Sequence, residues 1–367
     1  MNVVQICHDY HPPFPHICRL YGACFERDRF ELETVFLRGT ADSTLANNLP
    51  GKVTFLELPA GSLSGLKLKA MYRLMRLLRE KRPQLIIAHR FKPIYLSAIA
   101  AHRVGAGTVI GVAHELGMFK RPGRRWLARL LRSKLRLVGV SDFVAADLKA
   151  SLPGYPADHI TAIPNGIDIT RATNALLPKE EARLALDIPV SAKVIGTMGR
   201  MIAKKNQALL LEAFAVWPNK ADWLLVLMGN GRLRKKLEAR AQSLGIIEQT
   251  LFLGFVPEGS RYAAIFDLFV LTSRAEPFGM VLLEAMVAGV TVLGPNSGAA
   301  PEIVPDRAYV FDELTPGSLL KTIEYAKDHP VDKEQLEKFL QAKYSLSSFR
   351  KNLTSQTWLM NIKNLNR

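Results

Sequence analysis

The sequence has few cysteines and few aromatic residues. Its 367 residues include three cysteines, Cys7, Cys18 and Cys24. Their spacing fits neither a metal-ligand set nor a disulfide framework, so we expect buried thiols in a reducing compartment. Aromatic residues make up only 8%. Because no known nucleic-acid-binding module occurs either, the sequence argues against a nucleic-acid partner.

Long apolar runs and a leader pattern are also missing. No stretch approaches the roughly 20 apolar residues that span a bilayer. Residues 2–7 read as a short strand and lack the basic start of a signal peptide. We therefore expect a cytoplasmic protein.

Acidic residues are in deficit. There are 33 against 49 basic residues, a net charge of +16. Residues 1–168 carry 24 basic and 13 acidic side chains and the remainder 25 and 20, so most of the excess lies in the first half. Such a bias predicts an anionic partner, namely a phosphorylated substrate, a nucleic acid or a membrane surface.

Short apolar runs alternate with longer helical stretches along the chain. Many runs are apolar throughout, which is typical of parallel strands buried on both faces. The predicted strands are 3–7, 34–37, 53–58, 85–88, 108–113, 137–140 and 160–163, then 193–198, 224–228, 251–253, 268–272, 291–293 and 308–311. This pattern predicts an α/β fold with two Rossmann-like, doubly wound parallel-sheet domains facing one cleft.

The same pattern predicts the domain bounds. The N-terminal domain is expected at residues 1–180 and the C-terminal domain at residues 181–345. Residues 168–189 lack strand character and are interpreted as the linker. A C-terminal helical segment, about 346–367, is expected to pack back on the first domain.

Residues 268–289 place two acids around the start of a helix. Glu276 lies in the loop after the strand, and Glu284 lies about two turns into the helix. The unpaired N–H groups at a helix start favour an anion such as a diphosphate, and Gly279 lets the backbone approach a ligand closely. A carboxylate can accept hydrogen bonds from two neighbouring sugar hydroxyls, so the two acids suit a ribose and a hexose.

A second loop, residues 199–206, brings cations to a strand end. Gly199 and Arg200 follow the strand directly, and Lys205 precedes the next helix. Arginine offers a planar fork for phosphate oxygens and lysine a point charge, so together they can neutralise a leaving diphosphate. No Asp-x-Asp sequence occurs, so the sequence does not indicate a metal-bridged diphosphate, and we expect neither a metal nor a cofactor.

The order of these motifs resembles the retaining glycosyltransferases of family 4, two-domain GT-B enzymes that use nucleotide-activated sugars. The Gly-Arg…Lys-Asn loop is followed by Glu-x7-Glu and an Ala-Met-x-x-Gly helix end. The remaining matches are Val140–Asp142, Ile163–Asp168, Leu227–Gly231, Leu253–Val256, Gly289–Val292 and Pro301–Val304. The resemblance is strong over residues 138–312 and weak in the first half.

This resemblance implies a role for each matched residue. Arg200 and Lys205 correspond to the positions that hold the diphosphate, next to Gly199. Glu284 corresponds to the carboxylate on the ribose and Glu276 to the acid at the transferred sugar. The remaining implied contacts are backbone groups of Phe278, Gly279 and Met280, the base-side residues Phe255 and Val256, and His114 at the sugar site near the reacting carbon.

One loop departs from the family pattern. The family usually has a Gly-Gly loop after the first strand, whereas residues 9–16 contain three prolines and no glycine. This departure puts in doubt a backbone contact from that loop to the donor phosphate. His11 or His16 can face the acceptor instead, although loops commonly contain such histidines with no ligand, and we favour that interpretation.

Two basic helical stretches account for much of the charge. Residues 119–136 contain eight basic residues and no acid, and residues 66–82 show a similar pattern. We expect the apolar stripes of both helices, including Trp126 and Leu130, to lie in the core. The basic faces are expected to bind a partner, such as the anionic inner face of a membrane.

The sequence thus predicts a retaining hexosyltransferase. It would use a nucleoside diphosphate sugar, with UDP as the commonest choice in the family, and a glycan or glycolipid acceptor such as a lipopolysaccharide core or surface polysaccharide. It would be cytoplasmic and peripherally bound to the membrane. The alternatives are a GT-B nucleotide-sugar epimerase and a basic membrane- or nucleic-acid-binding protein without transfer activity. A nicotinamide dehydrogenase is disfavoured because no Gly-x-Gly-x-x-Gly follows either leading strand.

Overall fold

The computed structural model describes residues 1–11, 14–25, 30–40, 47–63 and 67–364. The chain divides into two compact units, Met1–Gly166 with Leu346–Arg367, and Ile167–Ser345. The boundary lies earlier than the expected one at residue 180, because the segment after Gly166 packs within the second unit. Its helix α7 (Ile169–Ala175) contacts α11 (Met280–Val287).

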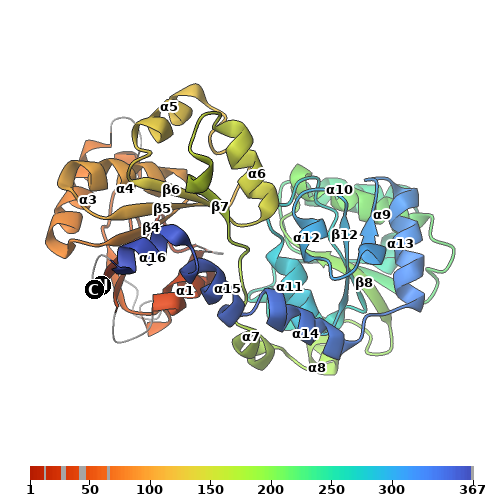
Figure 1. The fold of residues 1–367 in the computed structure, drawn as a ribbon. Helices are drawn as coiled ribbons and strands as arrows, with labels where there is room; N and C mark the ends of the chain where they lie inside the picture. The colour runs from red at the N-terminus through yellow and green to blue at the C-terminus, as the bar shows by residue number, and fades with distance from the viewer. Residues whose placement is uncertain (12–13, 26–29, 41–46, 64–66, 365–367) are drawn as a thin grey trace. The chain divides into compact units, whose positions relative to one another are not determined.

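In the described chain, the first unit contains a seven-stranded parallel sheet in the order β3-β2-β1-β4-β5-β6-β7 (Figure 1). Most residues in these strands are apolar and buried, which is why the sequence alternates so little within them. The strands are β1 (Asn2–Cys7), β2 (Glu31–Phe36), β3 (Lys52–Phe55), β4 (Leu85–His89), β5 (Thr108–Ala113), β6 (Leu135–Gly139) and β7 (Ile160–Ala162).

Helices connect and cover these strands. They are α1 (Phe14–Gly22), α3 (Leu68–Lys81), α4 (Phe91–Val104), α5 (Pro122–Leu130), α6 (Asp142–Ser151), α15 (Leu346–Thr354) and α16 (Thr357–Asn364). Phe349 of α15 packs edge-on against Tyr21 of α1, with ring centroids 4.9 Å apart, and the Arg350 side chain donates to the Ala23 carbonyl. The C-terminal helices therefore belong to the first unit.

The two basic helices differ in what they bury. In α3 the expected residues Ala70, Leu74, Leu77 and Leu78 are buried. In α5 only Ala128 is buried, and Trp126 and Leu130 are 65% and 60% exposed. The expectation of a buried apolar stripe is thus confirmed for α3 and wrong for Trp126 and Leu130, which point away from the core.

The second unit contains, within the described residues, a six-stranded parallel sheet in the order β10-β9-β8-β11-β12-β13. Its strands are β8 (Lys193–Met198), β9 (Trp223–Met228), β10 (Thr250–Gly254), β11 (Leu268–Val270), β12 (Thr291–Pro295) and β13 (Val310–Phe311). Its further helices are α8 (Lys179–Leu184), α9 (Gln207–Ala215), α10 (Arg234–Ser243), α12 (Ala300–Ile303), α13 (Pro316–Asp328) and α14 (Lys333–Lys343).

Both sheets reverse their strand order, between β1 and β4 in the first unit and between β8 and β11 in the second. In open α/β sheets, ligands bind at the carboxyl ends of the strands at such switch points. The loops that follow β8 and β11 are the two loops in which the sequence predicted the donor site.

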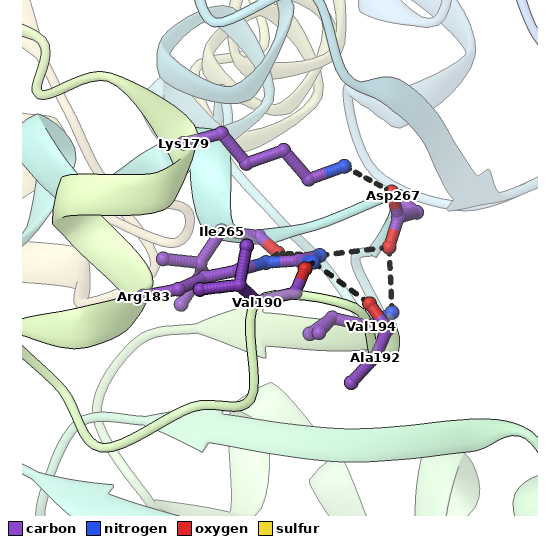
Figure 2. A network of polar contacts seen from close by, with 7 residues as sticks. All are labelled: Lys179, Arg183, Val190, Ala192, Val194, Ile265 and Asp267. Atoms are coloured by element: carbon purple, nitrogen blue, oxygen red, sulfur yellow. Dashed lines mark hydrogen bonds and ion pairs between the residues drawn. The ribbon is translucent and has the colours of Figure 1, made fainter.

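The segment expected as a linker contains a buried arginine that anchors the second unit (Figure 2). Arg183 of α8 is 2% exposed. Its guanidinium donates to the carbonyls of Ile265, Val190 and Ala192 and to the Asp267 carboxylate, so all five N–H donors are used. Asp267 also accepts from the Val194 N–H. This network ties α8 to the amino ends of β8 and β11, at the opposite end of those strands from the predicted donor loops.

The three cysteines are free and buried, as expected. Among the described helices, none is long and apolar enough to cross a membrane.

Candidate active site

The loop after β8 is shaped by a close approach of two glycines. Gly199 follows the strand with φ of +152°, and its N–H donates to the Met228 carbonyl at 2.9 Å. Gly229, with φ of +136°, lies against it: a Cβ at position 229 would meet the Gly199 carbonyl oxygen at 2.0 Å. Only glycine is compatible with this approach, which brings the loops after β8 and β9 together.

Lys205 and Glu276, two predicted catalytic residues, form an ion pair. Lys205 Nζ lies 2.7 Å from Glu276 Oε2, and the two side chains are 21% and 12% exposed. Two hydrogen bonds fix the loops on either side: the Thr272 hydroxyl donates to the Lys205 carbonyl at 2.8 Å, and the Arg274 N–H donates to the Lys204 carbonyl at 3.0 Å. The loops after β8 and β11 therefore present one joined, charged surface at the switch point.

The Glu276 backbone is held from the other side. Its carbonyl accepts from the Ala299 N–H at 2.9 Å. Gly298, with φ of +65°, approaches so closely that a Cβ there would lie 2.5 Å from the Glu276 nitrogen. Gly298 is not among the predicted site residues. Its place in the loop after β12 is a signal that could have identified it, because a glycine there allows the backbone of another loop to approach closely.

Helix α11 begins at Met280, two residues later than expected. Gly279 precedes it with φ of +102°, a left-handed conformation that favours glycine. Phe278 is buried, and its ring packs against Tyr344 with centroids 6.0 Å apart. The ring therefore belongs to the core, which leaves the backbone of residues 278–280 for the ligand contacts that the resemblance implies.

Glu284 has an unusual protonation equilibrium. Its side chain is only partly exposed, on the second turn of α11. Burial raises the pKa of its carboxyl to about 7, and the positive charge of Lys205 opposes this rise. Lys205 is therefore close enough to act on both predicted acids, Glu276 and Glu284.

The remaining predicted donor residues are more exposed. Arg200 is exposed, and its carbonyl accepts from the Gln207 side chain at 3.0 Å. Phe255, after β10, is 76% exposed, and its neighbour Val256 is partly exposed. An exposed aromatic ring on a loop can stack on a flat ligand, as the base-side role implies.

His114 lies in the first unit, directly after β5. Its Nε2 is 3.0 Å from Nδ1 of His89, at the end of β4, so one ring donates and the other accepts. Burial, and secondly the charge of Arg90, lower the pKa of His114 to about 3, and burial lowers that of His89 well below 6.5. Both rings are thus neutral at physiological pH.

Two family models match the chain one after the other. The model described as "Glycosyltransferase Family 4" matches residues 23–171, and the model described as "Glycosyl transferases group 1" matches residues 178–345. The chain belongs to the family 4 glycosyltransferases.

Individual relatives agree with this membership. The chain is 30% identical over 219 residues to the "Lipopolysaccharide core biosynthesis mannosyltransferase LpsB" of Rhizobium meliloti. This match covers 50% of the present chain and 62% of LpsB. It is 29% identical over 227 residues to a "GDP-mannose-dependent monoacylated alpha-(1-6)-phosphatidylinositol monomannoside mannosyltransferase" of Corynebacterium glutamicum, covering 58% of each. The matches thus span about three fifths of these relatives' own lengths.

A solved structure agrees on the fold. The structure aligns with the crystal structure of Anabaena Alr3699/HepE in complex with UDP at a TM-score of 0.77 and 20% sequence identity. The alignment covers 96% of the present chain and 98% of Alr3699/HepE. The two parallel-sheet units are therefore those of the GT-B fold, and this expectation is confirmed.

Proposed function

We propose that the chain is a retaining glycosyltransferase that moves a hexose-type sugar from a nucleoside diphosphate sugar to a glycan or glycolipid acceptor. The observation that carries the proposal is the Lys205–Glu276 ion pair at the switch point between β8 and β11. It sets a cation for the diphosphate directly beside an acid for the sugar.

The reaction breaks the bond between the anomeric carbon and the diphosphate oxygen and forms a bond from that carbon to the acceptor oxygen, on the same face of the sugar. Negative charge grows on the leaving diphosphate. Arg200, Lys205 and the N–H groups at the start of α11 stabilise that charge because they are already oriented in the folded protein. The leaving phosphate can take the proton from the acceptor hydroxyl, so the proposal needs neither a metal nor a dedicated base.

Supporting roles follow for the other predicted residues. Glu284 accepts from the ribose, Phe255 and Val256 flank the base, and Gly199 and Gly279 let backbone groups reach the phosphates. His114, as a neutral imidazole, accepts from or donates to a hydroxyl of the transferred sugar. UDP is the proposed nucleotide, as in the ligand named for Alr3699/HepE, while the Corynebacterium relative is named for GDP-mannose.

The first test is a thermal-shift screen of UDP- and GDP-sugars, which needs no acceptor. Transfer by Lys205→Ala and Glu276→Ala follows with the best donor, and we expect both to lose transfer while keeping the wild-type circular dichroism spectrum. Lys204→Ala is the matched control because it removes an exposed cation next to the pair. Near-wild-type turnover in either pair variant would refute the assignment. Product formation without acceptor would indicate an epimerase.

We further propose that α5 docks on the anionic inner face of a membrane, where a lipopolysaccharide core or surface polysaccharide acceptor would be presented. Trp126 and Leu130 are exposed apolar side chains, and Arg129 and Arg132 beside them are exposed cations. Exposed apolar groups flanked by basic residues are typical of interfacial helices.

Flotation with phosphatidylglycerol vesicles tests this docking. We expect Trp126→Ser with Leu130→Ser to reduce the bound fraction severalfold, because the apolar anchor is removed and the charge is kept. Val216→Ser is the control, since it removes an exposed apolar side chain from the second unit. Equal flotation of the double variant and the wild type would contradict the role.

A further inference from the structure

We propose that a pocket at the carboxyl ends of β4 and β5 binds an oxyanion group, a phosphate or carboxylate, of the acceptor. The inference rests on the proposed transferase function, because it assigns the pocket to that reaction's second substrate. The pocket has a volume of about 100 Å³ and is lined, among others, by Arg90, Phe91, His114, Glu115 and Arg124. All of its lining residues belong to the first unit.

Arg124 is positioned as a ligand-binding group. Its guanidinium lies 3.9 Å from the centroid of the Phe91 ring. Among the described residues it donates one hydrogen bond, from Nη1 to the Met118 carbonyl at 2.9 Å. The stacking fixes the plane of the guanidinium, while most of its N–H donors remain available to a ligand. A planar guanidinium can donate two parallel hydrogen bonds to the oxygens of a phosphate or carboxylate.

Arg90 supplies the second cation and carries backbone strain. Its φ is +72°, a region that residues other than glycine rarely adopt. The guanidinium lies 4.6 Å from the centroid of the Phe14 ring. Its nitrogens are 4.0 Å from carboxylate oxygens of Asp9 and of Glu115, too far for hydrogen bonds. Strain of this kind is found at functional sites, where it fixes a side chain in place.

The helix start adds to the positive potential. Arg90 is the residue before α4, and Phe91 is the first residue of that 14-residue helix. Helix N-termini carry partial positive charge. His114 lines the pocket as a neutral ring and adds no charge to it. Two carboxylates near Arg90 oppose this potential. Asp9 does not line the pocket, and Glu115, which does, is 68% exposed and can turn into solvent.

The same contacts disfavour a neutral sugar ring as the occupant. Sugars commonly stack on aromatic faces, but here Phe91 and Phe14 already carry the guanidinium groups of Arg124 and Arg90. The pocket therefore offers charge and planar donors, and a guanidinium already occupies one face of each of these rings.

The experiment follows the His114 imidazole by NMR in a ¹³C-histidine-labelled full chain. Arg200→Ala and Lys205→Ala are present throughout, so that the predicted diphosphate cations do not bind the probes. The probes are inorganic phosphate, glycerol 3-phosphate, acetate and glycerol, and the His114 signal is assigned with His114→Gln. We expect saturable shifts with the anions and none with glycerol.

Variants then test the residues. Arg124→Met should weaken phosphate binding about tenfold or more, because a charge-assisted fork is lost, and Arg124→Lys should recover part of it. Arg103→Met, which removes an exposed arginine of α4 that does not line the pocket, should bind as the parent does. Glu115→Gln should bind phosphate more tightly, since it removes the opposing charge. A gain of affinity cannot come from misfolding, so this variant tests the proposal even if Arg124→Met is unstable.

Several results would overturn the proposal: no saturable shift with any anion, equal shifts with glycerol, or unchanged phosphate affinity in Arg124→Met. A shift with phosphate alone identifies a phosphate acceptor, and one with acetate alone a carboxylate. Phosphatidylglycerol vesicles identify a lipid headgroup if they shift His114 as glycerol 3-phosphate does. The assay contains no sugar nucleotide and no transfer step, so its failure and a failure of the donor-side tests are distinguishable.

Discussion

Replacing Glu284 with glutamine should stabilise the unliganded protein and weaken its binding of the donor. Burial raises the pKa of the Glu284 carboxyl from 4.5 to about 7. In the folded chain the ionised form is therefore disfavoured relative to the unfolded chain. Ionising Glu284 therefore lowers the free energy of unfolding. This loss of stability is absent well below pH 4.5, grows as the pH rises to about 7, and is constant above that.

The size of this effect follows from the same two values. A rise from 4.5 to about 7 corresponds to at most about 3 kcal/mol of stability lost at pH 8. Because the side chain is partly exposed, solvent screens part of the cost, and we expect Glu284→Gln to gain about 1–2 kcal/mol at pH 8. For a unit of this size the gain raises Tm by about 2–6 °C.

Thermal unfolding monitored at pH 8, 6.5 and 5 measures the effect. The advantage of the variant should shrink as the pH falls, because the wild-type carboxyl then becomes protonated and resembles the amide. Glu248→Gln, which removes the charge of an exposed glutamate in the same unit, is the control. An advantage that stays constant with pH, or a loss of stability at pH 8, would refute the reasoning.

The same variant carries the functional half of the prediction. If Glu284 accepts from the ribose hydroxyls, the amide weakens that contact, and donor affinity should fall about tenfold or more, as for hydrogen bonds to charged groups. A gain in stability together with a loss of binding is the pattern of a residue kept for function. Unchanged donor affinity would remove Glu284 from the donor site.

Two further predictions concern the framework of the second unit. Arg183→Met should destabilise it by about 3–5 kcal/mol, because the carbonyls of Ile265, Val190 and Ala192 lose their buried donor. The partly exposed Asp267 carboxylate loses one of its partners but keeps Lys179. Urea unfolding measures the loss, and a change below 1 kcal/mol would contradict the anchoring role. Gly229→Ala should displace the loop of Gly199, since the new Cβ would meet its carbonyl oxygen at 2.0 Å, and thereby weaken donor binding in the thermal-shift screen. Wild-type donor affinity in that variant would show that the close approach is dispensable.

The strands could be predicted from the sequence because of where they lie. A parallel strand that is covered on both faces is mostly apolar, although it can bury a polar side chain such as Gln5 or Thr34. Each of the thirteen predicted stretches overlaps a strand of the described chain. The ends of the strands were predicted less accurately. Strand β11 ends at Val270, two residues before the predicted end, and Leu271 and Thr272 belong to the loop that follows it. The Thr272 hydroxyl in that loop donates to the Lys205 carbonyl. An apolar run in the sequence indicates burial and not hydrogen bonding between strands. Because Leu271 and Thr272 are as buried as the strand itself, the pattern could not show where the strand ends.

Contacts between distant residues could not be predicted in the same way. The motifs identified Lys205 and Glu276 separately, but not that they form an ion pair across 71 positions. Arg183 lies in a segment without strand character, and nothing local distinguishes it from a solvated arginine; its role depends on carbonyls and a carboxylate up to 84 positions away. Arg90 gives no sign of a left-handed backbone in the sequence, because the strain is imposed by the turn from β4 into α4.

Helix α5 shows why an apolar pattern alone does not decide burial. At 100° per residue, Trp126 and Leu130 share one face, while Ala128 lies roughly opposite Trp126. The helix therefore has two apolar faces, and only that of Ala128 is buried. The sequence pattern predicts one apolar stripe, which includes Trp126 and Leu130, and places it in the core. Because Trp126 and Leu130 are not buried, removing them should cost the fold little free energy, so a loss of membrane binding in their double variant would report on the surface and not on stability.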